Sequence, residues 1–174
     1  MRNVVYSVAM SLDGYVAGPN GEADWIVMDP EIDFRSLMAR FDTILMGRKT
    51  FDTAQAMGGG GSMPGMKSIV VSKTLRQADN RKLTIIGEDL GGTVSRLRAE
   101  SGKDIWLFGG GTLFRSLLNL KLVDRVEVAV IPVLLGGGIP LLPAGAGRMK
   151  LRLSSSKAYK ATGTVALEYI VEGV

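Results

Sequence analysis

Three strands predicted from the sequence are each followed by residues that can bind an anion. Gly109-Gly110-Gly111-Thr112 stands between an apolar strand and a helix. Glycines there let the backbone approach a pyrophosphate, and the helix N-terminus offers it free N–H groups. Gly47-Arg48-Lys49-Thr50 opens another helix with two positive charges and a hydroxyl, and Ser72-Lys73-Thr74 ends a third strand. Each segment alone is weak evidence, because polar residues are common at such junctions, but together they predict a ligand with several phosphates.

The chain contains no Cys and no His. This excludes thiolate nucleophiles, Ser-His-Asp triads and zinc sites built from sulfur or imidazole, so no metal site is predicted. A proton must then come from a carboxylate, Lys, Tyr or water. Asp33 and Asp13 are the two candidate acids, although acids favour helix N-termini in any case and Asp before Gly often only forms a turn.

The length and charge of the chain indicate a single domain that binds a small molecule. Its 174 residues fit one domain with a proper core. The net charge of +4 is spread along the chain without a basic stripe, which argues against nucleic-acid binding and suits an anionic ligand. The uncharged stretch Val128–Gly147 is interrupted by Pro and Gly, so no membrane segment is expected and the cytoplasm is the expected location.

Short apolar strands alternate with helices along most of the chain. Asp29 and Pro30 are predicted to begin a helix whose apolar face runs from Phe34 to Phe41, and Thr93 is predicted to cap another. The remaining predictions are loops over Ser11–Trp25 and Gly58–Gly61, a helix from Thr112, and strands over Val4–Met10, Thr43–Met46, Ser68–Val71, Leu83–Ile86, Ile105–Phe108, Val126–Leu135, Leu151–Tyr159 and Val165–Val171.

This alternation predicts an α/β fold with a mostly parallel central sheet and helices on both faces. The last two strands have no helix between them, so the C-terminal end of the sheet should be antiparallel. Ligands of such sheets bind at the carboxyl ends of the strands, which is where the glycine-rich and polar segments gather.

Four segments, in their order and spacing, resemble the dihydrofolate-reductase superfamily and, within it, the reductase half of the riboflavin-biosynthesis deaminase-reductase proteins. They are Ser11–Gly21, Gly47–Thr50, Ile105–Gly111 and Pro132–Pro140, and together they extend over nearly the whole chain. The resemblance implies a single dihydrofolate-reductase-like domain over residues 1–174, built as a three-layer sandwich that binds NADPH.

The resemblance also implies roles for individual residues. Trp25 would flank the substrate. Arg48, Ser72 and Lys73 would hold the 2′-phosphate that distinguishes NADPH from NADH. The other cofactor-binding residues would be Ala9, Val16, Ala17 and Gly18 near the nicotinamide, and Gly47, Lys49, Thr50, Phe108, Gly109, Gly110, Gly111, Thr112 and Leu113 near the pyrophosphate.

The sequence departs from folate enzymes at one position. Those enzymes carry an Arg after a Pro-Gly pair, whereas Met66 follows Pro64-Gly65 here and cannot pair with a carboxylate. A phosphoribosylamino-pyrimidine is therefore the leading substrate, and dihydrofolate is the alternative. The rival from another class of function is a nucleotide-binding module without turnover.

The resemblance also implies a homodimer. The strand Val126–Leu135 either lies at the interface of this dimer or is an internal strand of the sheet.

Overall fold

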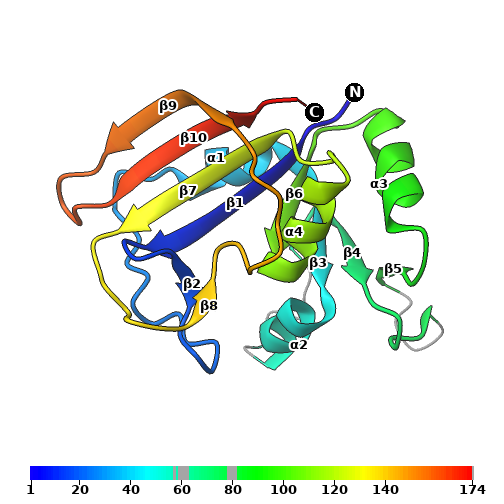
Figure 1. Ribbon diagram of the computed structural model, residues 1–174, viewed down its shortest axis with the longest axis horizontal. Coiled ribbons are helices and arrows are strands. Elements are labelled where there is room, and N and C mark those ends of the chain that lie inside the picture. The colour runs from blue at the N-terminus through cyan, green and yellow to red at the C-terminus, as the bar shows by residue number, and fades with distance from the viewer. Residues whose placement is uncertain (57, 59–62, 78–81, 174) are drawn as a thin grey trace.

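The computed structural model describes residues 1–56, 58, 63–77 and 82–173, so most of the loop predicted over Gly58–Gly61 lies outside the described residues. Eight strands form one sheet in the order β5-β4-β3-β6-β1-β7-β10-β9 (Figure 1). Their bounds are β1 Val4–Ser11, β3 Phe41–Gly47, β4 Lys67–Val71, β5 Thr84–Ile86, β6 Asp104–Gly109, β7 Arg125–Ile131, β9 Leu151–Ala158 and β10 Val165–Val171.

The sheet has a parallel and an antiparallel part, as predicted. From β5 to β7 every neighbouring pair of strands is parallel. β10 pairs in the antiparallel sense with both β7 and β9. The carboxyl ends of the six parallel strands therefore meet along one edge of the sheet.

Helices cover both faces of the sheet. Side chains of α3 (Leu90–Ala99) and α4 (Gly111–Asn119) pack in the larger core cluster, on one face. α1 (Phe34–Ala39) and α2 (Arg48–Ala56) contribute Met38 and Phe51 to a second cluster, on the other face. Figure 1 shows α4 in front of the sheet and α1 behind it. The predicted α/β arrangement with helices on both faces is confirmed.

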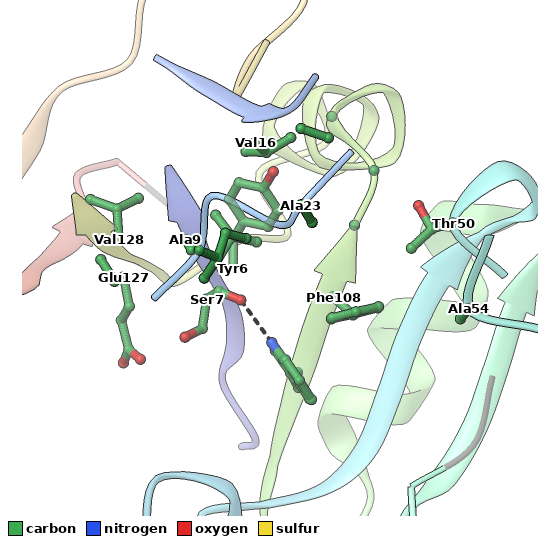
Figure 2. A pocket seen from close by; sticks show the side chains of 18 of the residues that line it. Tyr6, Ser7, Ala9, Val16, Ala23, Thr50, Ala54, Phe108, Glu127 and Val128 are labelled. Atoms are coloured by element: carbon green, nitrogen blue, oxygen red, sulfur yellow. Dashed lines mark hydrogen bonds between the residues drawn. The ribbon is translucent and has the colours of Figure 1, made fainter. Parts of the chain in front are cut away.

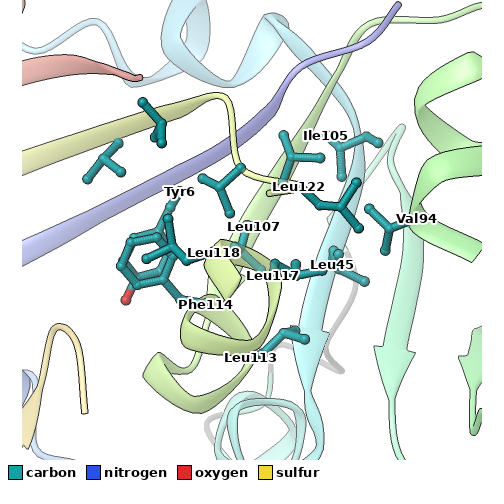
Figure 3. Packing of buried hydrophobic residues seen from close by; sticks show 14 of the residues in the cluster. Tyr6, Leu45, Val94, Ile105, Leu107, Leu113, Phe114, Leu117, Leu118 and Leu122 are labelled. Carbon is teal, nitrogen blue, oxygen red and sulfur yellow. The ribbon is translucent and has the colours of Figure 1, made fainter. Parts of the chain in front are cut away.

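The larger core lies between α4 and the middle of the sheet (Figure 3). Tyr6 of β1 stacks on Phe114 of α4, with ring centroids 3.8 Å apart. Leu113, Leu117 and Leu118 are also buried, at the spacing expected of one helix face. This packing fixes the start of α4 against β1 and β6.

The helix predicted to begin at Asp29 begins at Phe34 instead, with Asp33 as its N-cap. The fully buried Asp29 carboxylate accepts hydrogen bonds from the Glu31 amide at 2.9 Å and from Thr162 Oγ1 at 2.9 Å. Asp29 is thus held by the turn between β9 and β10 rather than by a helix. Phe41, predicted on the helix face, is the first residue of β3.

Three further boundaries differ from prediction. α3 begins at Leu90, because Asp89 accepts the Gly92 amide and takes the capping role predicted for Thr93. β7 ends at Ile131, since Pro132 has no N–H for the ladder. The predicted loop over Ser11–Trp25 contains β2 (Tyr15–Ala17), which pairs with β8 (Ile139–Pro140).

β7 lies inside the sheet, between β1 and β10. Of the two placements predicted for Val126–Leu135, the structure supports the internal one, because neither edge of β7 is available to a partner chain. No helix in the described ranges is both long and apolar enough to cross a bilayer.

The packing of α4 predicts unequal effects of one substitution at two leucines. Leu117 is fully buried and Leu120, at the end of the same helix, is 49% exposed. We expect Leu117→Ala to lower the free energy of unfolding by about 2–5 kcal/mol, because it leaves a cavity. Leu120→Ala should cost under about 1 kcal/mol. Urea titration measures both, and equal losses would contradict the described core.

Candidate functional site

A cavity of about 1390 Å³ opens at the carboxyl edge of the parallel strands. Pockets for one small ligand usually measure roughly 300–1,000 Å³, so this one has room for a dinucleotide and a second molecule. In Figure 2, Thr50 and Ala54 lie at one end, Glu127 and Val128 at the other, and Ala9 between them. The two ends are built from different elements and carry different charges.

The first end contains the start of α4. Its N-cap, Gly110, has no side chain, so no capping group covers the N–H groups at the start of the helix. Gly109 has a φ of +136°, which favours glycine, and a Cβ on Gly111 would lie 2.8 Å from Pro143 Cδ. A Cβ on Gly110 would lie 3.2 Å from Thr50 Oγ1 and would narrow the space between α4 and α2. The three glycines thus leave a helix N-terminus open to the cavity, as a pyrophosphate requires.

The start of α2 faces the same end of the cavity with Arg48, Lys49 and Thr50. Arg48 Nε donates to both carboxylate oxygens of Asp52, at 2.7 and 2.8 Å. The two side chains are 40% and 48% exposed, and such a surface pair contributes little to stability. Arg48 can therefore exchange this partner for a phosphate at low cost.

Thirteen of the sixteen cofactor-binding residues predicted from the sequence line this one cavity. They are Ala9, Val16, Ala17, Gly47, Arg48, Lys49, Thr50, Phe108, Gly109, Gly110, Gly111, Thr112 and Leu113.

The other three, Gly18, Ser72 and Lys73, lie outside the lining. Ser72 Oγ accepts the Thr74 and Leu75 amides and so shapes a turn. Gly47, the last residue of β3, is in register with Val71, the last residue of β4. The residues that follow Val71, Ser72 and Lys73, therefore lie at the strand end beside Arg48. The three segments predicted to bind an anion therefore share one edge, although the third stands outside the cavity.

The loop predicted to cover the nicotinamide is fastened to the segment after β7. β2 pairs with β8, and the Leu12 amide donates to the Val133 carbonyl at 2.9 Å. A Cβ on Gly138 would lie 2.3 Å from the Ala17 carbonyl oxygen, so only glycine permits this approach. Val16 and Ala17 are thereby held against the cavity.

Asp13 belongs to this fastening and does not line the cavity. Its carboxylate accepts the Ser11 hydroxyl at 2.6 Å, the Gly136 amide at 2.7 Å and the Leu135 amide at 3.1 Å. The Ser11 hydrogen bond, followed by the two amides, lowers the pKa of Asp13. A proton donor needs the opposite, so this geometry assigns Asp13 a structural role and gives no support to the predicted catalytic one.

Asp33 lines the cavity but is occupied as the cap of α1. It accepts the Ser36 amide at 3.0 Å and the Ser36 hydroxyl at 2.5 Å, and that hydroxyl is the main cause of a lowered pKa. Trp25, predicted to flank the substrate, lies outside the lining and donates its indole N–H to the Glu22 carbonyl. Its predicted role has no support in this geometry.

The second end of the cavity holds a group that the sequence reasoning missed. Glu127 of β7 is 5% exposed, and its two carboxylate oxygens accept from Arg40 at 2.6 and 3.1 Å. The hydrogen bond to Glu127 is the main cause of a raised pKa of Arg40. The sequence offered one signal for this group, a single acid within the apolar run Val126–Ile131. A carboxylate in a buried strand is almost always paired, so Glu127 could have been expected to have a basic partner.

Small side chains surround Glu127 in register across three strands. Ala9 of β1, Ala129 of β7 and Ala166 of β10 form one row. Ser7, Glu127 and Glu168 form the next. All six residues line the cavity, and they leave a shallow floor on which a flat ring can lie.

Comparison with known proteins identifies the family of the chain. The RibD C-terminal domain family matches residues 2–165. The chain belongs to this family. It is 34% identical to the uncharacterized protein YyaP of Bacillus subtilis strain 168, over 97% of this chain and 94% of YyaP.

Solved structures place this RibD C-terminal domain in the dihydrofolate-reductase-like fold, as the sequence predicted. A putative riboflavin biosynthesis protein from Shewanella sp. PV-4 superimposes with a TM-score of 0.81 at 27% identity, covering 99% of each chain. Dihydrofolate reductase from Enterococcus faecalis, solved with NADP(H), has a TM-score of 0.71 at 13% identity, covering 98% of this chain and 96% of its own.

The bonds of Asp13 predict a pH-dependent contribution to stability. Its pKa is lowered in the folded state, so its contribution is present above the unfolded pKa, about 3.9, and disappears as the pH falls through the folded value. We expect Asp13→Ala to lower the urea midpoint at pH 7 and to have a much smaller effect at pH 3. Asp24→Ala, at an exposed position, is the control. An Asp13→Ala effect of the same size at both pH values would refute the role.

Proposed function

We propose that the protein is an NADPH-dependent reductase that transfers a hydride to a C=N or C=O bond of a small heterocycle. The observation that carries the proposal is the convergence of thirteen predicted cofactor residues on one cavity large enough for two ligands. Membership of the RibD C-terminal domain family supports the same activity class.

In this proposal each part of the first end binds one part of the dinucleotide. The open N-terminus of α4, with Lys49 and Thr50, holds the pyrophosphate. Arg48 and the neighbouring strand end with Ser72 and Lys73 hold the 2′-phosphate outside the enclosed space. Ala9, Val16 and Ala17 face the nicotinamide. The lack of a Cβ at Gly110 is what leaves room for the phosphates.

The proton comes from water in this proposal. The cofactor supplies the hydride to the carbon of the reduced bond, and the nitrogen or oxygen takes up one proton. Asp33 and Asp13 have lowered pKa values and remain ionised at neutral pH, and the chain has no His. In this proposal neither candidate acid gives up a proton, and the residues of the cavity orient the reactants.

The substrate predicted from the sequence, a phosphoribosylamino-pyrimidine, is the first compound to test. Dihydrofolate has weaker support, because Met66 packs against the second core cluster and offers no charge to a carboxylate. Oxidation of NADPH in the presence of pyrimidines and of pterins separates these substrates. Binding of NADPH without oxidation by any compound of either class would favour the nucleotide-binding module predicted as the rival.

Arg48 provides a prediction about cofactor choice. We expect Arg48→Ala to weaken NADPH binding by roughly ten- to a hundredfold, because charged hydrogen bonds to the 2′-phosphate are lost, and to leave NADH binding nearly unchanged. Arg96→Ala is the control, since Arg96 of α3 also forms an exposed pair with an acid, the N-cap Asp89, and lies outside the lining of the cavity. Thermal shifts with each dinucleotide measure both affinities. Equal losses for NADPH and NADH would contradict the assignment.

A further inference from the structure

Two carboxylates stand opposite each other at the second end of the cavity. Glu127 of β7 is in register with Glu168 of β10, so both side chains project from the same face of the sheet. Like charges placed directly opposite on neighbouring strands are destabilising. Arg40 offsets only part of this repulsion, because it donates hydrogen bonds to the Glu127 carboxylate and to the Leu37 carbonyl but none to Glu168.

Glu168 keeps an unused carboxylate. Among the described residues, no hydrogen bond or ion pair involves the Glu168 side chain. Arg40 lies close enough to Glu168 for the negative charge of Glu168 to raise the pKa of Arg40. Glu127 also keeps acceptor capacity, since each of its oxygens accepts one bond from Arg40 and has a second lone pair. The sheet thus holds acceptors that folding does not require.

The surroundings of this pair suit a flat ring. The alanine row of Ala9, Ala129 and Ala166 forms the floor. Met28 and Phe34 also line the cavity while 53% and 40% exposed, so apolar surface is available to a ligand. A ring held between these surfaces would have its edge at the carboxylates.

The charges at this end disfavour a phosphate. The described residues that line it include three acids, Asp33, Glu127 and Glu168, and one base, Arg40, which is already paired. The other bases of the lining, Arg48 and Lys49, belong to α2 at the opposite end. A phosphorylated substrate would meet repulsion here without an unpaired cation to bind it.

We infer that the Glu127–Glu168 pair is a recognition subsite for a flat, amino-substituted nitrogen heterocycle that presents N–H donors or a positive charge and carries no phosphate. The inference names the substrate class of the proposed reductase and so rests on that function. It favours an unphosphorylated ring over the phosphoribosylamino-pyrimidine predicted from the sequence, so of these two compounds the unphosphorylated one should be reduced faster.

Three probes with the same ring test the charge preference directly. Benzamidine presents two parallel N–H groups and a positive charge, benzamide is its neutral analogue, and phenyl phosphate is an anion. We expect isothermal titration to give the tightest binding for benzamidine and about tenfold weaker binding for benzamide. Phenyl phosphate can bind only at the first end, so its affinity should not change in Glu168→Gln. Failure of benzamidine to bind, or binding of phenyl phosphate that depends on Glu168, would overturn the inference.

Glu168→Gln tests the residue without removing a partner of Arg40. We expect this variant to bind benzamidine about tenfold or more weakly, because a charge-assisted pair becomes neutral. Its urea midpoint should stay the same or rise, because the opposed charges are relieved. Glu172→Gln removes one charge beyond the end of β10 and should leave benzamidine affinity unchanged. Unaltered benzamidine affinity in Glu168→Gln would refute the subsite.

The same proteins are titrated separately with NADPH, so that the two proposals can fail independently. Glu168→Gln should bind NADPH as the unaltered protein does, since the phosphate-binding segments lie at the other end of the cavity. Benzamidine binding that depends on Glu168 without any NADPH binding would end the proposed function and leave the subsite. NADPH binding without Glu168-dependent benzamidine binding would end the subsite and leave the proposed function.

Discussion

The parallel alignment of β3, β6, β1 and β7 is the constraint on which the site depends. Because these strands run in the same direction, Gly47, Gly109, the end of β1 and Ile131 all reach the same edge of the sheet. The glycine-rich and charged segments are far apart in the sequence and meet only for this reason. The cores on the two faces keep the strands in this order, and the packing of Phe114 on Tyr6 sets the start of α4 beside them.

The cavity carries opposite charges at its two ends. Arg48, Lys49 and an open helix N-terminus provide positive potential at β3 and β6. Glu127 and Glu168 provide negative potential at β7 and β10. A cavity polarised in this way can orient two ligands, an anionic dinucleotide and a hydrogen-bond-donating ring, so that they meet over Ala9 on β1. The fold thus supplies the shared edge for the first end and the sheet face of β7 and β10 for the second.

Features set by local sequence could be predicted, and features set by distant contacts could not. The apolar strands and the glycine runs at their ends are local, and the parallel sheet followed from them. The cofactor residues came from the family resemblance, and thirteen of them line one cavity. Asp29 has the sequence of a helix cap, but Thr162 captures its carboxylate through a contact 133 residues away. The opposition of Glu127 and Glu168 depends on the register of β10 against β7, which the sequence pattern does not specify. The bonds of Asp13, one of the two candidate acids, could not be predicted for the same reason, because its partners Leu135 and Gly136 lie far along the chain.

Fluorescence of Trp106 tests the central claim, that this cavity binds a reduced nicotinamide dinucleotide. Trp106 is 5% exposed, lines the cavity and packs edge-on against Phe108. In the variant Trp25→Phe it is the only tryptophan, and reduced nicotinamide absorbs where tryptophan emits. Titration of this variant with NADPH should quench the emission of Trp106 to a plateau, and oxidised NADP⁺ added afterwards should restore part of it by displacement. Emission that stays constant throughout the titration would contradict the account.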